Sequence, residues 1–560
     1  MPIKSLQVGQ VLLDEKLISQ SQLDEALKLQ KTDKSSKLGD ILVQSGAVTE
    51  RQLMKALEAC LKVPYVELAE MIIDSKAPGL ISEELAQRHN VIPIAINGRQ
   101  LTLATSDPMN FYAIDDIRLA TNMEIKPVLC APTEITNAIN NFYSSKNAQA
   151  AAADLSREFS DITIRQLSDD VSDKIDNAPV VRLVTSMIAQ AAKLGASDIH
   201  IEPLETKTRV RMRIDGVLQD QMTLALAAHS SIITRLKIMG NMNIAEKRVP
   251  QDGRVEIMLD GQPVDLRLSV LPTVTGEKMV IRILGGTGTL LSIKDLGLSE
   301  DNSRLFADIL KSPNGIILIS GPTGSGKTTT LYTILGNLNK PGVNIITVED
   351  PVEFRMPGVN QVQVNIKAGL TFASGLRSIL RQDPDIIMVG EIRDDETAQI
   401  AVRAAITGHL VLSTIHTNDT ASTVSRLINM NVEPYLVSSA LVGIVAQRLV
   451  RRICPRCIAG YDPSEYEKKL LKLQDNAQLH KGRGCNYCGH TGYKGRVAVH
   501  EIMVITREMR ALIDGSVTTD TLRESAQKNG TVTLQECCRQ LVLDGVTSLE
   551  EMLKATYTNG

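Results

Sequence analysis

The residues best suited to chemistry in this chain form a phosphate-binding loop. The segment GPTGSGKT, residues 321–328, fits the pattern G-x-x-x-x-G-K-[ST], follows the apolar segment IILIS and opens a helical pattern. In such loops backbone amides surround the phosphates, the lysine reaches the β- and γ-phosphates, and the hydroxyl binds Mg²⁺. The sequence therefore predicts an NTPase. Its predicted nucleotide-binding residues are Gly321, Pro322, Thr323, Gly324, Ser325, Gly326, Lys327, Thr328 (also for Mg²⁺) and Thr329.

Acidic side chains follow two further apolar segments. NIITVEDPVEF supplies Glu349, Asp350 and Glu353, and DIIMVGEIRDDE supplies Glu391. Parallel strands bring such side chains to the same edge of the sheet as the phosphate-binding loop. There, one acid can hold Mg²⁺ through water while another orients or deprotonates the attacking water. The alternative for any one of them is a solvated loop acid.

Two histidines flank the apolar segment within GHLVLSTIHTND. Because His409 and His416 border a strand of the nucleotide domain, we expect them to position or sense the γ-phosphate. A structural role is the alternative. A metal site is disfavoured, since no carboxylate or cysteine lies beside them at ligand spacing.

Four of the eight cysteines form two CxxC pairs. Cys454, Cys457, Cys485 and Cys488 give the spacing CxxC-x27-CxxC, which suits a tetrahedral zinc site with four thiolates. Such a site has no open position, so we expect a structural role. Unlinked buried or redox thiols are the alternative. Together with the absence of an extracellular signature, this cysteine usage indicates a reducing, cytoplasmic environment.

Composition disfavours other classes of protein. The net charge is −3, Trp is absent and aromatic residues make up 3%, so neither an electrostatic nor a base-stacking surface for nucleic acid is indicated. No apolar run reaches the roughly 18 residues that a membrane-spanning helix needs. We therefore expect a cytoplasmic protein.

The sequence divides into several α/β and helical units. Residues 1–62 repeat with an offset of 30, as VGQVLLDEKLISQSQLDEAL and LGDILVQSGAVTERQLMKAL, and each copy has a capping box, Ser19 with Gln22 and Thr49 with Gln52. Residues 63–143 predict a small α/β unit with a hairpin at Asn97-Gly98. Further predicted units are a linker at 144–174, a mixed α/β domain at 175–290, and a parallel-sheet α/β domain at 291–560, with a zinc insert at about 450–495 and a helical tail.

Several long motifs resemble those of the secretion and pilus ATPase superfamily. They are GASDIHIEP, RMRIDGVL, AEKRVPQDGR, LPTVTGEK, GPTGSGKTTTLY, TVEDPVEF, LRSILRQDPDIIMVGEIRD and GHLVLSTIHTND. The resemblance covers about residues 175–555. It is greatest to the type IV pilus assembly (PilB-like) and type II secretion (GspE-like) motors. It implies a RecA-like P-loop ATPase domain, a PAS-like domain before it, a hexameric ring, and ATP with Mg²⁺ and Zn²⁺. The tetracysteine insert further resembles assembly and secretion motors, as opposed to retraction motors.

The same resemblance implies roles for individual residues. Glu353 matches the proposed catalytic base, and Glu391 matches the Walker B glutamate, with Gly390 where many ATPases have Asp. His409 and His416 match the His box. The catalytic arginines implied on the preceding domain are Arg211, Arg213 and Arg248.

The N-terminal repeat resembles the MshEN domain, which in some pilus motors binds cyclic di-GMP. The candidate binding residues are Gly9, Lys37, Leu38, Gly39 and Gly46. This chain departs from the family pattern, because the first copy lacks the motif arginine and has Lys16 at the position of a glycine. Cyclic di-GMP binding is therefore one expectation, and a docking module for an inner-membrane partner is the other.

The function implied is an ATP-driven motor for type IV pilus assembly, with the type II secretion motor as the alternative. The implied partners are other copies in a hexamer, an inner-membrane platform protein (PilC/GspF-like) and a cytoplasmic adaptor (PilM/GspL-like), which would hold the protein at the cytoplasmic face of the inner membrane. A nucleic-acid translocase is disfavoured by charge and composition. A non-hydrolysing cyclic-dinucleotide receptor is disfavoured by Lys327, Glu353 and Glu391.

Overall fold

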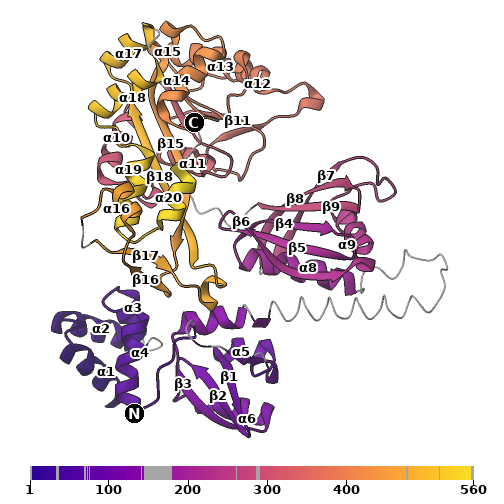
Figure 1. Ribbon diagram of the computed structural model, residues 1–560, viewed down its shortest axis with the longest axis vertical. Coiled ribbons are helices and arrows are strands. Elements are labelled where there is room, and N and C mark those ends of the chain that lie inside the picture. Colours follow the sequence, from indigo (N-terminus) through magenta and orange to yellow (C-terminus); the bar gives the residue numbers. More distant parts are fainter. Residues whose placement is uncertain are drawn as a thin grey trace.

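The computed structural model places an N-terminal domain, a middle domain and a large α/β domain in chain order (Figure 1). It describes residues 3–32, 37–68, 71, 73–74, 76–140, 142–143, 179–259, 261–284, 291–474, 477–515 and 518–556. The predicted linker at 144–174 lies outside the described residues. Within the described ranges, no helix combines the length and apolar character needed to cross a membrane.

The N-terminal repeat folds as two helical pairs. They are α1 (Ile3–Asp14) with α2 (Gln20–Thr32), and α3 (Leu38–Gln44) with α4 (Glu50–Leu61). Thr49 and Gln52 form the predicted capping box, and Ser19 and Gln22 make the same reciprocal hydrogen bonds. A Cβ at Gly9 would lie 2.8 Å from Leu23 Cδ1, and one at Gly39 would lie 2.8 Å from Leu53 Cδ2. The repeated glycines therefore let the two helices of each pair pack closely.

The following α/β unit packs on this repeat through Leu129 and Ala131. Its sheet has the order β1-β2-β3, with β1 (Val91–Asn97) and β2 (Gln100–Thr105) antiparallel and β3 (Glu124–Leu129) parallel to β2. The hairpin predicted at Asn97-Gly98 is thereby confirmed. Its helical elements are η1 (Pro78–Leu80), α5 (Glu83–His89), α6 (Phe111–Thr121) and a helical stretch at 132–140.

The middle domain is a six-stranded antiparallel sheet that packs on two helices. Its elements are α8 (Pro179–Lys193), β4 (Ala196–Pro203), β5 (Lys207–Ile214), β6 (Val217–Ala225), α9 (Leu226–Met239), β7 (Gln251–Leu259), β8 (Gln262–Thr273) and β9 (Gly276–Leu284), with the sheet order β6-β5-β4-β9-β8-β7. Alternation along β8 buries Leu266, Leu268 and Val270 against the helices. Arg267 between them therefore lies on the opposite face.

The large domain is built on a seven-stranded sheet of order β12-β11-β13-β14-β10-β15-β18, in which only the β15–β18 pair is antiparallel. The strands are β10 (Gly315–Ser320), β11 (Ile345–Glu349), β12 (Asn360–Gln363), β13 (Ile386–Val389), β14 (Leu410–Ile415), β15 (Leu441–Ile453) and β18 (Tyr493–Val504). Apolar clusters lie on both of its faces, as a sheet covered by helices requires. The helical elements are η3 (Ile293–Leu296), α10 (Glu300–Leu310), α11 (Lys327–Leu338), η4 (Ile366–Ala368), α12 (Phe372–Ile379), α13 (Asp395–Ile406), α14 (Thr420–Asn429) and α15 (Pro434–Ala440).

An insert between β15 and β18 carries the cysteines. It consists of β16 (Ile458–Tyr461), α16 (Glu465–Leu471), β17 (Leu479–Gly482) and η5 (Asn486–Cys488), and it lies at the end of the large domain that faces the N-terminal domain (Figure 1). The predicted helical tail follows as α17 (Arg507–Asp514), α18 (Thr519–Lys528), α19 (Leu534–Leu543) and α20 (Leu549–Thr556).

Candidate nucleotide site and tetracysteine cluster

The phosphate-binding loop connects the fully buried strand β10 to the N-terminus of α11. Gly321 and Gly326 have φ values of 144° and 87°, and a Cβ on either would meet Gln447 at 2.4 and 2.8 Å. Only glycine fits both positions. Lys327 Nζ donates to the carbonyl oxygens of Gly321 at 2.7 Å and Pro322 at 3.0 Å, while Thr328 is exposed at the first turn of α11. Backbone amides at a helix N-terminus fit a phosphate.

Burial lowers the pKa of Lys327 to about 8, although the nearby Glu391 carboxylate raises it. A bound phosphate group would supply a negative counter-charge and so favour the protonated form of Lys327. The electrostatics and the geometry of Lys327 are therefore both compatible with the prediction that it binds phosphate.

Gln447 on β15 holds the phosphate-binding loop in place through hydrogen bonds that the sequence does not predict. Its Nε2 donates to Ser325 O at 2.9 Å, and its Oε1 accepts from Thr330 Oγ1 at 2.7 Å. The side chain is 2% exposed. A strand more than a hundred residues downstream thus fixes the loop, and no spacing in the sequence indicates that contact.

Glu391 lies at the carboxyl edge of the sheet, where the sequence predicts it, and His416 lies beside it. His416 Nε2 lies 3.4 Å from Glu391 Oε2, and Arg393 Nε lies 2.6 Å from the same oxygen. Burial and the Lys327 charge lower the pKa of His416, although the Glu391 carboxylate raises it. Gly390, the departure from the usual aspartate, packs against β11, where an added Cβ would lie 3.3 Å from Glu349 Cα.

Glu353 lies beyond β11 and faces the middle domain. Burial raises the pKa of its carboxyl group, and the charge of Arg267 partly offsets that effect. The distance from Arg267 Nη2 to Glu353 Oε2 is 3.9 Å. A carboxylate with a raised pKa is a better proton acceptor, which suits the predicted catalytic base.

A buried network holds the segment that carries Glu353. Tyr332 on α11 donates to Glu349 Oε2 at 2.5 Å, and its Oη accepts from the Glu353 backbone N–H at 3.2 Å. Glu349 also accepts from Thr347 Oγ1 at 2.6 Å and from Gln361 Nε2 at 3.1 Å. Glu349 is therefore a structural acid that is 3% exposed.

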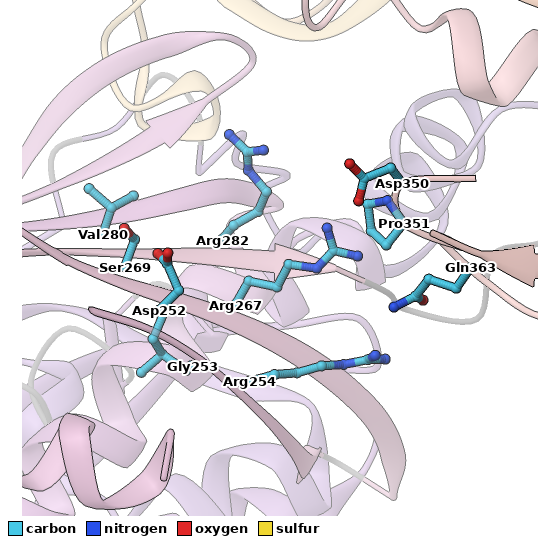
Figure 2. A pocket seen from close by; sticks show the side chains of 11 residues that line it. Asp252, Gly253, Arg254, Arg267, Ser269, Val280, Arg282, Asp350, Pro351 and Gln363 are labelled. Atoms are coloured by element: carbon cyan, nitrogen blue, oxygen red, sulfur yellow. The ribbon is translucent and has the colours of Figure 1, made fainter. Parts of the chain in front are cut away.

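The arginines that face the large domain are not those predicted. Figure 2 shows Arg254 and Arg267 extending from the middle-domain sheet toward Gln363 and Asp350, in a pocket of about 590 Å³ that Arg282 also lines.

The predicted arginines make other contacts within this chain. Arg211 pairs with Glu202 at 2.7 Å, Arg213 lies 3.6 Å from Asp198, and Arg248 pairs with Glu246 at 2.7 Å. The sequence identified the arginine-rich domain, but it did not indicate which face of that domain's sheet meets the large domain.

The structure contradicts the prediction that His409 borders the nucleotide. His409 precedes β14 and its Nδ1 lies 3.0 Å from Ala404 O, whereas His416 follows the strand. The rise per residue of a strand separates the two by about 20 Å. The opposite edge of the sheet carries the phosphate-binding loop, so only His416 reaches the site.

The four predicted cysteines form one cluster. Their Sγ atoms all lie within 4.8 Å of one another, and three of the separations are 3.8 to 3.9 Å. A tetrahedral ion with Zn–S bonds of about 2.3 Å requires S···S separations of about 3.8 Å, whereas a disulfide needs about 2.05 Å. Burial raises the pKa of the Cys488 thiol, but hydrogen bonds from the Cys485 and Gly492 amides lower it by more, so that the pKa is below its usual value. The donor set therefore fits a structural zinc ion.

The predicted cyclic di-GMP residues serve the packing of the N-terminal domain. Gly9 and Gly39 lie between helices, Leu38 is buried, and Gly46 has a left-handed φ of 72°. Lys37 Nζ forms an ion pair with Asp107 at 2.6 Å.

Comparisons with known proteins agree with this geometry. The family model described as "Type II/IV secretion system protein" matches residues 173–554, and the MshEN domain model matches residues 61–149, which follow the helical repeat. The pilus assembly ATPase PilB of Myxococcus xanthus is 40% identical over 98% of both chains. PilB of Thermus thermophilus is 43% identical over 98% of this chain, which spans 66% of that protein.

Other relatives belong to type II secretion systems or share the fold alone. The type II secretion system protein E of Pseudomonas aeruginosa is 45% identical over 70% of this chain and 78% of its own. The solved ATPase DotB of Yersinia pseudotuberculosis superposes with a TM-score of 0.51 at 20% identity, covering 70% of this chain and 97% of that one. Because the family model matches more than half of the sequence, the chain belongs to the family of type II/IV secretion system proteins.

Proposed function

We propose that this protein is an ATP-hydrolysing motor that powers assembly of a type IV pilus. The observation that carries the proposal is the convergence of Lys327, Glu391 and Glu353 around one edge of the sheet, next to a domain that supplies arginines. Full-length relatives at 40% and 43% identity are named pilus assembly ATPases.

The residues divide the chemistry between them. Lys327 would bind the transferred phosphoryl group and, with Thr328, hold ATP and its Mg²⁺. Glu391, oriented by His416, would bind the water ligands of that ion, and Glu353 would accept the proton of the attacking water. An arginine on the middle domain, here Arg267, would stabilise the developing charge only when the two domains are close, which couples hydrolysis to domain movement.

Type II secretion is the second candidate function. The secretion system protein E of Xanthomonas campestris is 39% identical over 98% of this chain. A match that includes the N-terminal domain therefore does not distinguish pilus assembly proteins from secretion proteins. Both would use the same site and the same type of partner. The distinction needs an experiment in the native host.

The test is Glu391→Gln in the native host, with surface pili and the secreted proteins measured together. Glu300→Gln at the exposed start of α10 is the matched control, since it makes the same chemical change away from the site. Loss of pili with normal secretion is the expected result. Retained pili with proteins accumulating inside the cell would replace the proposal with the secretion motor.

We further propose that the motor is a homo-hexamer at the cytoplasmic face of the inner membrane, working on a platform protein and held by an adaptor. Membership of the family supports an oligomeric ring and an inner-membrane partner. Light scattering with the Glu391→Gln protein and ATP tests the ring, because the variant should bind the nucleotide without hydrolysing it. A monomer under all nucleotide conditions would contradict it.

The MshEN match supports cyclic di-GMP as a ligand of the N-terminal domain. Calorimetry of the whole chain against Lys37→Ala tests it, because Lys37 is an exposed cation whose partner Asp107 could be exchanged for a phosphate. No heat of binding with the unmodified protein would leave the domain as a docking module.

A further inference from the structure

The tetracysteine module, defined as residues 454–457 and 485–496, contacts the N-terminal domain through both of its CxxC turns. Arg456, between Cys454 and Cys457, places Nη1 2.7 Å from Glu134 Oε1. Asn486, between Cys485 and Cys488, donates from Nδ2 to the Met71 carbonyl oxygen at 2.8 Å.

The Arg456–Glu134 pair is shielded from solvent. The two side chains are 21% and 7% exposed, and the other Glu134 oxygen accepts from the Leu68 amide at 2.7 Å. A buried carboxylate that loses its cation is strongly destabilised. This contact is therefore a specific one, unlike an exposed surface ion pair, which contributes little.

The position of Arg456 depends on both CxxC turns being held together. Its guanidinium lies 4.2 Å from the centroid of the Tyr487 ring, which belongs to the second turn. The two turns come from segments about thirty residues apart. Backbone hydrogen bonds from Cys454 N to Gly492 O and from Arg483 N to Cys457 O, both 2.9 Å, bring them together, and the four sulfur atoms cluster between them. An ion bound by those sulfurs would fix the spacing between Arg456 and Asn486.

The same module also contacts the middle domain. Asp215, in the turn between β5 and β6, accepts from the Gly495 amide at 2.9 Å and lies 3.8 Å from Arg496 Nε. A pocket of about 340 Å³ lies between the two, lined by Asp215 and Asp220 on one side and by Tyr487 and Lys494 on the other. All three domains therefore meet at the cysteine module.

We propose that the tetracysteine module is the interface that holds the N-terminal and middle domains against the ATPase domain, and that metal loading organises it. The N-terminal surface that it binds is the acidic and backbone-carbonyl patch made by Glu134 and Met71. Removal of the metal separates the two CxxC turns and releases this patch, so the metal content of the chain controls domain docking.

Hydrogen–deuterium exchange of the full-length protein tests the proposal without any activity measurement. The variants are Arg456→Gln and Asn486→Ala, which keep all four thiolates, and the metal-free double variant Cys454→Ser/Cys485→Ser. Arg483→Gln is the matched control, because Arg483 is an exposed cation of the same insert. Zinc content is measured for every protein by mass spectrometry.

The expected result is one zinc ion per chain in the unmodified protein, Arg456→Gln, Asn486→Ala and Arg483→Gln. In Arg456→Gln and Asn486→Ala, peptides that contain Leu68 and Glu134 should exchange at least about tenfold faster. The metal-free variant should show this increase and also faster exchange at Asp215. Unchanged exchange in Arg456→Gln and Asn486→Ala would overturn the interface, and unchanged exchange in the metal-free variant would overturn the role of the metal.

Discussion

The hydroxyl group of Tyr332 connects the ATP-binding helix to the segment that carries Glu353, and its removal gives the sharpest prediction. Tyr332→Phe keeps the ring, which is 1% exposed and packs edge-to-face on Phe354 at 4.4 Å. It removes one hydrogen bond to the buried Glu349 carboxylate and one from the Glu353 amide. Hydrogen bonds to charged groups contribute about 1.5–3 kcal/mol, and an unpaired buried amide costs about 1–3 kcal/mol.

We therefore expect Tyr332→Phe to destabilise the ATPase domain by about 3 kcal/mol and to lower kcat about tenfold, because the base is no longer positioned. Urea unfolding followed by fluorescence or circular dichroism measures the first effect, and a phosphate-release assay measures the second. Tyr466→Phe, at an exposed ring on α16, is the control.

A double-mutant cycle with Glu349→Gln isolates the contact between the two side chains. Neutralising the carboxylate should recover part of the loss, with a coupling energy of about 0.5–3 kcal/mol. Strict additivity of the two substitutions would refute the reasoning, since it would mean that the hydroxyl does not stabilise this carboxylate. So would a kcat unchanged in Tyr332→Phe.

Three further predictions concern other parts of the chain. Lys16 has a left-handed φ of 56° where the second repeat has Gly46, so Lys16→Gly should raise the stability of the N-terminal domain by about 1 kcal/mol and Gly46→Lys should lower it, both read from thermal unfolding. Arg267→Ala removes the charge that lowers the raised pKa of Glu353, so the acid limb of kcat/KM, where activity is lost as the base becomes protonated, should move to higher pH. Gln447→Leu removes two supports of the phosphate-binding loop and should raise the Kd for ATP about tenfold by nucleotide titration, and an unchanged Kd would contradict the role assigned to it.

Local patterns in the sequence predicted much of this site because their chemistry is carried by neighbouring residues. A phosphate-binding loop, a capping box or a CxxC turn is complete within a few positions. The sequence therefore directly indicates residues 321–328, Thr49 with Gln52, and Cys454 with Cys457. The two CxxC pairs also indicated each other, since four thiolates satisfy one tetrahedral ion. The position of Glu391 followed from the rule that parallel strands end at one edge.

Other assignments needed the tertiary structure because they depend on contacts between distant segments. Gln447 lies beneath a loop 120 residues earlier only because β15 pairs with β10. His409 and His416 have the same residue type and border the same strand, yet strand direction places only His416 at the nucleotide edge. The arginine-rich sheet presents Arg267 to Glu353 through a domain packing that no local pattern encodes.

The sequence by itself indicated the reaction, since short motifs with local geometry specify the residue types that are suited to phosphate, Mg²⁺ and zinc. Only the tertiary structure decided which side chains act together across the domains, Arg267 with Glu353 and Arg456 with Glu134. The physical reason is that an ion pair or a hydrogen bond requires separations of a few ångströms. For pairs that lie 86 and 322 residues apart in the sequence, such separations are set by the packing of whole domains.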